Sequence, residues 1–219
     1  RLIQYLKCLP VKVVSIDKVE ADDIIAYMSK DMAKRFNTKS YIVSSDRDFL
    51  QLVDDNVTVY RPIEREFYSP ATVQEKFGIV PENFIHYKVL LGDASDKVPG
   101  VKGLGKKGVL KRFPELADGP MPFDRLFELS EERLKDSVIY ARIIQNWDQL
   151  LNTKKIMDLE IPMVSDKEKE FLSQFPEEPL NELRILEFMS LYNEDGMTHI
   201  IKNTEFWLKD TFTRLVYDA

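Results

Sequence analysis

The sequence predicts an α/β fold, in which a parallel sheet is followed by a helical region that carries a helix–hairpin–helix motif. Up to about residue 90, short β-branched runs alternate with segments of helical spacing. This alternation is typical of parallel strands joined by crossover helices. From Pro70 onward the pattern is helical, and a run of glycines and lysines between residues 98 and 108 interrupts it.

The first part of the chain supplies the expected sheet. Its expected elements are a strand over residues 11–16, a helix over about 21–36, a strand over 41–43, a short helix over 49–52 and a strand over 57–59. The longer helix is predicted from apolar residues at helical spacing, namely Ile24, Ile25, Met28 and Met32. Ligands of parallel sheets bind at the carboxyl ends of the strands, so residues that follow each strand are candidates for a site.

The second part of the chain is expected to be almost entirely helical. Candidate helices cover residues 71–77, 81–91, 105–113, 123–129, 131–151, 166–175, 180–192 and 197–212, with a strand-like segment over 159–164. The aromatic-rich stretch from Phe206 to Leu215 is expected to dock as a C-terminal helix. We therefore expect two domains, an α/β core over residues 1–84 and a helical region over 85–219 whose hairpin motif occupies about 85–116.

The composition is that of a globular protein that keeps its cysteine reduced. The chain has 219 residues, 44% of them hydrophobic and 31% charged, and its one cysteine, Cys8, can form no internal disulfide. No apolar run approaches the roughly 20 residues that span a bilayer, and no signal peptide is visible, so we expect a cytoplasmic protein without a membrane partner. The net charge is −6, yet Lys97 to Arg112 contains only basic charges, which indicates local contact with phosphates.

Carboxylates occur in three groups that follow or precede predicted elements. The groups are Glu20, Asp22 and Asp23 at a helix start, Asp46 and Asp48 after a strand, and Asp93 and Asp96 in a loop. Each group has a structural explanation, because acidic residues favour helix N-termini, cap short helices and form turns. Together they predict a cluster on one edge of the sheet.

Such a cluster requires cations. Carboxylate oxygens without histidine or cysteine favour Mg²⁺ or Mn²⁺ over zinc. Two such ions about 4 Å apart can stabilise both the attacking and the leaving oxygen of a phosphodiester. No Ser–His–Asp or Cys–His arrangement offers a competing nucleophile.

The glycine–lysine run predicts a phosphate-binding hairpin. Its candidate DNA-binding residues are Lys97, Gly100, Lys102, Gly103, Gly105, Lys106, Lys107 and Gly108. Glycines let a turn approach a phosphate closely, and the following helix begins at its amides. A dinucleotide-binding G-x-G-x-x-G interpretation is disfavoured because a helix and a loop, rather than a strand, precede it. A plain glycine-rich turn with solvated lysines is the simpler alternative.

The motifs resemble those of the 5′ nuclease (flap endonuclease) family. Val-Glu-Ala-Asp-Asp at 19–23, Ser-Ser-Asp-Arg-Asp-Phe at 44–49 and Gly-Asp-Ala-Ser-Asp-Lys-Val-Pro-Gly from residue 92 occur in that family's order and spacing, over residues 10 to 115. The family includes the 5′-3′ exonuclease domain of bacterial DNA polymerase I and phage 5′ exonucleases and RNase H enzymes. The resemblance implies a PIN-like nuclease core.

The resemblance also implies roles. Glu20, Asp22 and Asp23 look like ligands of a first metal ion, and Asp46, Asp48 and Asp93, supported by Asp96, like ligands of a second; Glu20, Asp22, Asp46, Asp48 and Asp93 would be catalytic. The hairpin would grip duplex DNA and, as in relatives, hold a potassium ion. Expected substrates are 5′ flaps, nicks and primer–template or RNA–DNA duplexes, and expected partners are a polymerase or single-stranded-DNA-binding protein in a bacterial or phage-infected cell.

The resemblance has gaps that leave two other functions open. Family members begin with a strand bearing an Asp and then carry a basic helical arch, and neither is found here, so the chain is expected to bind duplex DNA but to cleave poorly alone. A non-catalytic duplex-binding fragment is therefore the alternative function. A toxin-like ribonuclease is the third, and the hairpin argues against it.

Overall fold

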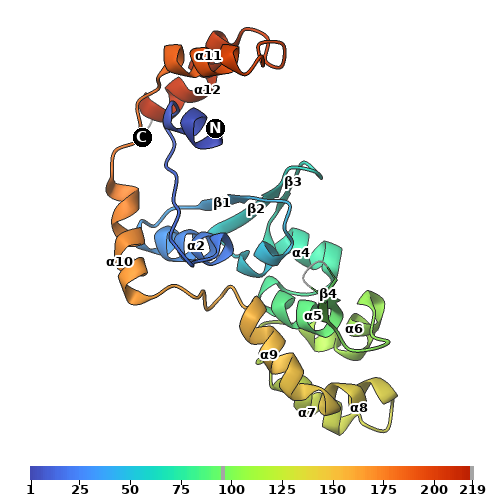
Figure 1. The fold of residues 1–219 in the computed structure, drawn as a ribbon. Helices are drawn as coiled ribbons and strands as arrows, with labels where there is room; N and C mark the ends of the chain where they lie inside the picture. The colour runs from blue at the N-terminus through green and yellow to red at the C-terminus, as the bar shows by residue number, and fades with distance from the viewer. Residues whose placement is uncertain (95–96, 218–219) are drawn as a thin grey trace. The chain divides into compact units, whose positions relative to one another are not determined.

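The computed structural model describes residues 1–94 and 97–217, and the side chains of 1–94 and 97–212. By its internal contacts the chain forms two compact units. The central unit is Val19–Ser165, and the terminal unit combines Arg1–Lys18 with Asp166–Ala219. Figure 1 shows the elements of both.

The central unit is a small sheet with helices. Its elements are α2 (Ala21–Tyr27), the π-helical turn η1 (Met28–Met32), α3 (Ala33–Arg35), β1 (Ser40–Val43), the 3₁₀ helix η2 (Asp48–Leu52), β2 (Val57–Arg61), β3 (Glu66–Tyr68), α4 (Pro70–Phe77), η3 (Pro81–Asn83), α5 (Phe84–Leu91), β4 (Gly92–Asp93), β5 (Val98–Pro99), α6 (Lys106–Arg112), η4 (Pro114–Ala117), α7 (Arg125–Glu132), α8 (Val138–Gln145) and α9 (Trp147–Met157). The α/β class, the parallel strand pair and the helices after Pro70 are confirmed.

The sheet has the strand order β1-β2-β3. β1 and β2 are parallel, with Ser40 opposite Val57 and Val43 opposite Tyr60. β3 pairs antiparallel with β2, and the sequence did not predict it because only three residues form it. Alternate residues of β2 are buried, as expected for a strand with one face on the core.

One core runs through the whole central unit. The buried cluster includes Ile42 and Val59 of the sheet, Val89 of α5, Val109 of α6 and Ile143 of α8. The predicted division at residue 84/85 therefore falls inside a continuous core, and as a division by function it stays a prediction. Hydrophobic burial on this scale fixes the helices to the sheet and positions the loops between them.

Two buried amides tie distant segments together. Gln51 of η2 donates to the carbonyl of Met157 at 3.1 Å and accepts from the amide of Leu159 at 3.0 Å. Asn83, which is fully buried at the start of α5, donates to the carbonyls of Leu116 and Gly119 at 3.0 and 2.7 Å. These bonds fix the position of η2 and α5, the two elements that carry Asp48 and precede Asp93.

Two expected elements of the central unit are different in the structure. The single helix predicted over 131–151 is interrupted, because Ser137 is extended and its hydroxyl caps α8. The strand predicted over 159–164 is absent, because side chains satisfy its amides: Asp23 accepts from the amide of Met163 at 2.8 Å, as Gln51 does from Leu159. A segment held in this way needs no neighbouring strand.

The terminal unit is helical. It contains α1 (Leu2–Lys7), α10 (Asp166–Gln174), η5 (Phe175–Glu177), α11 (Ile185–Glu194) and α12 (Thr204–Tyr217). Its core includes Cys8, Phe188 and Leu208, so the expected docking of the C-terminal helix is confirmed. The last two helices begin later than predicted. Among the described residues no helix is long and apolar enough to cross a membrane.

The strand predicted over residues 11–16 is not formed. Lys12 donates to the carbonyls of Phe175 and Pro176 at 2.5 and 3.1 Å, and the Asn181 amide donates to the carbonyl of Val11 at 2.8 Å. Side-chain hydrogen bonds thus replace strand pairing along this extended segment.

Candidate active site

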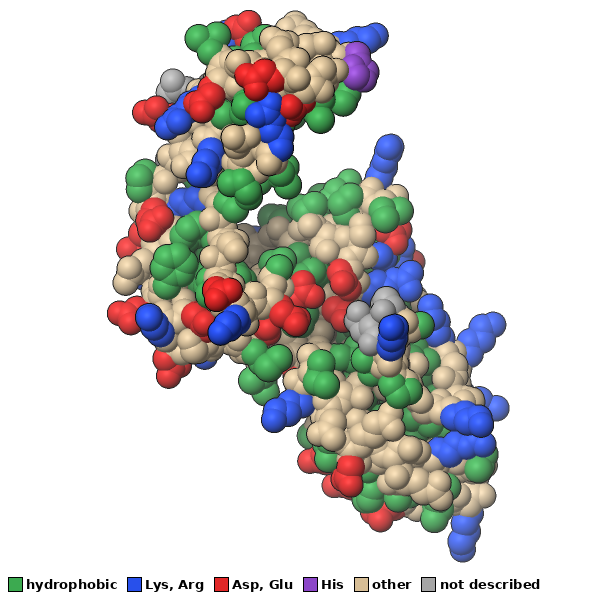
Figure 2. Space-filling view, viewed as in Figure 1, with side chains coloured by type: hydrophobic (Ala, Val, Ile, Leu, Met, Phe, Trp, Pro, Cys, Tyr) green, Lys and Arg blue, Asp and Glu red, His purple; other side chains and the backbone are tan. Residues whose placement is uncertain are grey.

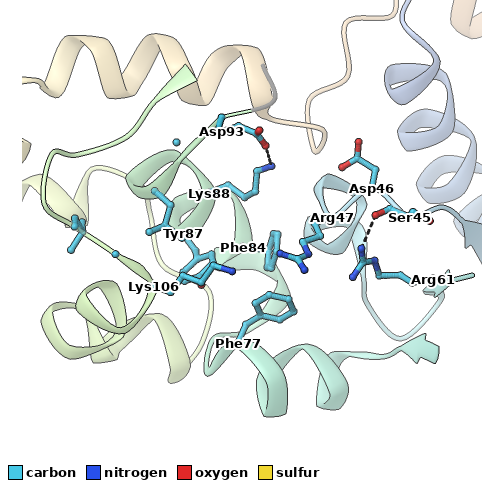
Figure 3. A pocket seen from close by; sticks show the side chains of 15 residues that line it. Ser45, Asp46, Arg47, Arg61, Phe77, Phe84, Tyr87, Lys88, Asp93 and Lys106 are labelled. Carbon is cyan, nitrogen blue, oxygen red and sulfur yellow. Dashed lines mark hydrogen bonds and ion pairs between the residues drawn. The ribbon is translucent and has the colours of Figure 1, made fainter. Parts of the chain in front are cut away.

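The loop after β1 presents Asp46 and Asp48. The Ser44 hydroxyl accepts from the amide of Asp46 at 3.0 Å, and the Asp46 carboxylate accepts from the amide of Asp48 at 2.9 Å. These are local turn bonds, and the N-cap of η2 is Arg47 with no side-chain cap hydrogen bond, so the capping role considered from the sequence is not formed. Arg61 of β2 donates to the carbonyl of Ser45 at 2.7 Å and so fixes the loop to the sheet (Figure 3).

Asp93 is presented by a very close approach of two backbone segments. β4 pairs with β5, with Gly92 opposite Pro99 and Asp93 opposite Val98. A Cβ on Gly92 would lie 2.2 Å from the amide nitrogen of Gly100, and one on Gly100 would lie 2.1 Å from the carbonyl of Leu91. Gly92 also has a φ of +72°. This contact accounts for glycine at position 100 without any ligand, so its predicted DNA contact stays untested.

Lys88 connects the two carboxylate loops. Its ammonium on α5 forms ion pairs with Asp48 and with Asp93, the latter at 2.6 Å, and the three side chains are only 13–18% exposed. Burial alone would lower the pKa of Lys88, but the hydrogen bonds that it donates to Asp48 and Asp93 raise the pKa above its ordinary value. The sequence analysis did not identify Lys88, because a lone lysine in an apolar helix gives no signal.

Asp22 completes the acidic group from the start of α2. Burial, followed by the negative charges of Asp46 and Asp48, raises the pKa of Asp22 above its ordinary value. The structure therefore brings the helix-start and strand-end carboxylates into electrostatic contact, as predicted. Glu20 is exposed at the N-cap of α2.

One predicted ligand, Asp23, has a structural contact of its own. Asp23 is 6% exposed, and its carboxylate accepts from the amide of Met163. That hydrogen bond gives Asp23 a structural function in holding the segment after α9. Asp96 lies outside the described residues. The predicted roles of both remain predictions.

A pocket of about 810 Å³ joins the carboxylates to the hairpin. Its lining includes Asp46 of the loop after β1, Lys88 and Asp93, and Gly105 and Lys106 of the hairpin. Figure 3 shows Asp93 and Lys88 on one side and Asp46 with Arg47 on the other. Phe77, Phe84 and Tyr87 form the apolar part of the lining.

The hairpin itself is exposed and basic. The exposed residues are Lys97, Lys102, Gly103, Gly105, Lys106 and Lys107, whereas Gly108 is partly buried. Gly103 has a φ of +83°, and Arg142 of α8 donates to the carbonyl of Lys102 at 2.7 Å, which fixes the turn. A Cβ on Gly105 would meet no atom within 4 Å, so the backbone there is open to a ligand.

Charge is distributed unevenly over this face. Figure 2 shows acidic side chains close to the sheet and η2, and basic side chains gathered over α6 and α8. The chain has a net negative charge, yet its central unit presents a basic surface beside a pocket that Asp46 and Asp93 line. Arg142 of α8 lies beside the hairpin, because its guanidinium donates to the carbonyl of Lys102.

The donor set fits a hard divalent cation, but the geometry is not that of a formed metal site. All the donors are carboxylate oxygens, and the Lys88 ammonium already provides a positive charge between Asp48 and Asp93. Within residues 1–94 and 97–217, no three carboxylate, histidine or cysteine side chains are close enough to share an ion. Mg²⁺ or Mn²⁺ would therefore require small movements of these side chains.

Comparisons with known proteins place the chain among 5′-3′ exonucleases. The family profile described as "5′-3′ exonuclease, N-terminal resolvase-like domain" matches residues 1–78. The thermostable DNA polymerase I of Thermus thermophilus is 32% identical over 181 residues, which are 81% of this chain and 21% of that protein. The 5′-3′ exonuclease of Aquifex aeolicus is 37% identical over 114 residues, which are 50% of this chain and 39% of that protein.

A solved structure shows the same fold. The bacteriophage T5 flap endonuclease, in a pseudo-enzyme–product complex with DNA and metal ions, superposes with a TM-score of 0.61 at 21% identity. The match covers 74% of this chain and 60% of that one. The chain spans 21% and 39% of the length of the two curated relatives from Thermus thermophilus and Aquifex aeolicus.

Proposed function

Because this chain belongs to the 5′ nuclease family, we propose that it contributes a carboxylate-bearing pocket and the duplex-binding hairpin of a metal-dependent 5′-3′ exonuclease or flap endonuclease. The observation that carries the proposal is the shared pocket. Its lining combines Asp46 and Asp93 with Gly105 and Lys106, so a phosphate bound by the hairpin lies next to the carboxylates.

Asp46, Asp48 and Asp93 would hold the divalent ions, with Asp22 and Glu20 beside them. Bound there, Mg²⁺ or Mn²⁺ would make a water nucleophilic and stabilise the leaving 3′ oxygen. The chain itself contributes a concentration of negative charge. Each of these carboxylates raises the free energy of its ionised neighbours unless a cation binds between them. Burial is the main reason that the pKa of Asp22 is raised, and the charges of Asp46 and Asp48 raise it further.

The hairpin would position the substrate. Lys102, Lys106 and Lys107 are exposed on one turn, and the open backbone at Gly105 permits a close approach. Contacts of this kind bind the phosphate backbone without reading sequence. DNA with a 5′ flap or nick, or an RNA–DNA hybrid, is the proposed substrate class, and the hairpin carbonyls are the proposed place for K⁺.

A cleavage assay with matched variants tests this function. The chain is incubated with Mg²⁺ and a 5′-labelled flap duplex, and Asp46→Asn and Asp93→Asn are compared with Glu66→Gln, whose carboxylate pairs with Lys76 on the surface. We expect slow Mg²⁺-dependent cleavage, because the chain is expected to cleave poorly alone, and we expect both aspartate variants to abolish it and the control to retain it. Cleavage that is unaffected by either aspartate variant would contradict the proposal.

A second function, duplex binding without cleavage, is favoured by Lys88. Its ammonium neutralises Asp48 and Asp93, and the described residues contain no ready group of three metal ligands. In that case the chain binds the flap duplex through its hairpin, the bound DNA stays intact with Mg²⁺, and the aspartate variants do not alter binding.

A further inference from the structure

Lys88 occupies the position between two carboxylates where a divalent cation is expected. We propose that Lys88 is a resident counter-cation, which holds Asp48 and Asp93 together in the metal-free protein and is displaced when a divalent ion binds. The inference rests on the proposed function, because it assumes that these carboxylates are ligands. It adds a positioning residue that competes with the metal.

The contacts of Lys88 show why it must move. Its ammonium pairs with Asp48 Oδ1 and Asp93 Oδ2, so one oxygen of each carboxylate is already used. An ammonium and a divalent ion cannot share those oxygens at coordination distance, because like charges a few ångströms apart repel strongly in a partly buried place. Binding of the ion therefore releases the lysine.

The residues around Lys88 explain why a cation is needed there and leave space into which its side chain can move. Asp48 and Asp93 are 17% and 18% exposed, and two such carboxylates would repel each other without a cation. The adjoining pocket of about 810 Å³ is lined by Lys88 itself. The flexible four-carbon side chain can turn into this space without disturbing the buried face of α5.

The chain contains a matched control for this chemistry. Lys30 also bridges two carboxylates, Asp54 at 2.9 Å and Glu160 at 3.1 Å, and its side chain is 27% exposed. These residues do not line the pocket that contains Asp46 and Asp93. Lys30→Met therefore removes a lysine of the same kind at a place where no metal is proposed.

The first test measures Mn²⁺ binding by calorimetry, without DNA, on the 219-residue chain and on Lys88→Met, Lys88→Arg and Lys30→Met. We expect Lys88→Met to bind Mn²⁺ at least about tenfold more tightly than the unaltered chain, since removal of one nearby charge is worth that much or more. Lys88→Arg and Lys30→Met should bind no more tightly than the unaltered chain. Equal or weaker binding by Lys88→Met would overturn the inference.

A second test needs no substitution, so it holds even if Lys88→Met fails to fold. Lysines of the unaltered chain are modified with a limiting amount of an amine-reactive reagent. The modified fractions of the peptides that contain Lys88 and Lys30 are then measured by mass spectrometry. We expect Mn²⁺ to increase the modification rate of Lys88 several-fold while Lys30 stays constant. An unchanged or slower rate at Lys88, in a chain that calorimetry shows to bind Mn²⁺, would overturn the inference.

The two tests separate this inference from the proposed function. If the unaltered chain and every variant bind Mn²⁺ with the same affinity, the counter-cation role fails and the metal site survives. If neither the unaltered chain nor any variant binds Mn²⁺ at millimolar concentration, both fail together.

Discussion

At the scale of single residues, the function of each charged group is determined by its contacts. Asp46 and Asp93 line a pocket and Asp48 pairs with Lys88 at its edge, whereas Asp23 is buried against the amide of Met163. The sequence could group these carboxylates, because they follow predicted elements. It could not identify Asp23 as structural, since the amide that its carboxylate accepts from lies 140 residues away.

His86 is a buried residue with a measurable effect on stability. Both ring nitrogens are buried without a hydrogen-bond partner, the ring packs 5.2 Å from that of Phe123, and burial, with Lys154 nearby, lowers the pKa of His86 to about 4. The unfolded chain takes up a proton near pH 6.5, and the folded chain does so only near pH 4. The free energy of unfolding therefore falls as the pH drops from 6.5 to 4.

Replacement of His86 by Leu should remove this pH dependence. We expect the unaltered chain to lose up to about 3 kcal/mol more than His86→Leu between pH 7 and pH 4, because each pH unit between the two pKa values is worth roughly 1.4 kcal/mol. Urea denaturation at several pH values measures the difference between the two proteins. Parallel pH dependences would show that His86 is not held neutral in the folded protein.

At the scale of elements, the β4–β5 bridge positions Asp93. Gly100→Ala would place a methyl group 2.1 Å from the Leu91 carbonyl, so the bridge must open. We expect stability to fall by about 3 kcal/mol, as for other substitutions that force the backbone apart. Thermal denaturation followed by circular dichroism measures it, and a midpoint like that of the unaltered chain would contradict this close packing of β4 on β5.

Gly105→Ala is the matched control within the same loop region. No atom lies within 4 Å of the added Cβ, so we expect stability to change by less than about 1 kcal/mol, as for a helix N-cap glycine. If a phosphate approaches the backbone there, the variant should nevertheless bind duplex DNA more weakly. Retention of full binding affinity would place the DNA elsewhere.

Elements with a strong local pattern were predictable, and those that depend on distant partners were not. β1, β2, α4, α5 and α6 follow from β-branched runs, caps and glycines. The prediction of a strand over 159–164 was wrong. The side chains of Gln51 and Asp23, which are far away in sequence, accept hydrogen bonds from two of its backbone amides. Of the site, the carboxylate groups and the hairpin were visible in the sequence, and their roles stay predictions. Lys88 and Arg61 could not be predicted, because only tertiary contacts define them.

At the scale of the whole molecule, a chain with a net charge of −6 must use local charge to bind an anionic partner. The triple variant Lys102→Gln, Lys106→Gln and Lys107→Gln should therefore bind duplex DNA more weakly. The slope of the logarithm of its association constant against the logarithm of the salt concentration should be smaller in magnitude by about 0.9 for each phosphate that the variant no longer neutralises. Fluorescence anisotropy at several salt concentrations measures both the affinity and this slope.

The control for this prediction is Lys34→Gln with Lys39→Gln, since these lysines are exposed and lie outside the hairpin. We expect the control to keep the salt dependence of the unaltered chain. If the control and the triple variant weaken binding equally, the hairpin is not the site of DNA contact.

The central claim is that carboxylates of η2 and β4 gather a hard cation in the pocket that the hairpin also lines. Crystals grown with Mn²⁺ and measured for anomalous scattering test it most directly. We predict a Mn²⁺ peak at coordination distance from Asp48 and Asp93, with the Lys88 ammonium moved away from both. A map without a peak there, in which Lys88 still bridges the two carboxylates at saturating Mn²⁺, would contradict the claim.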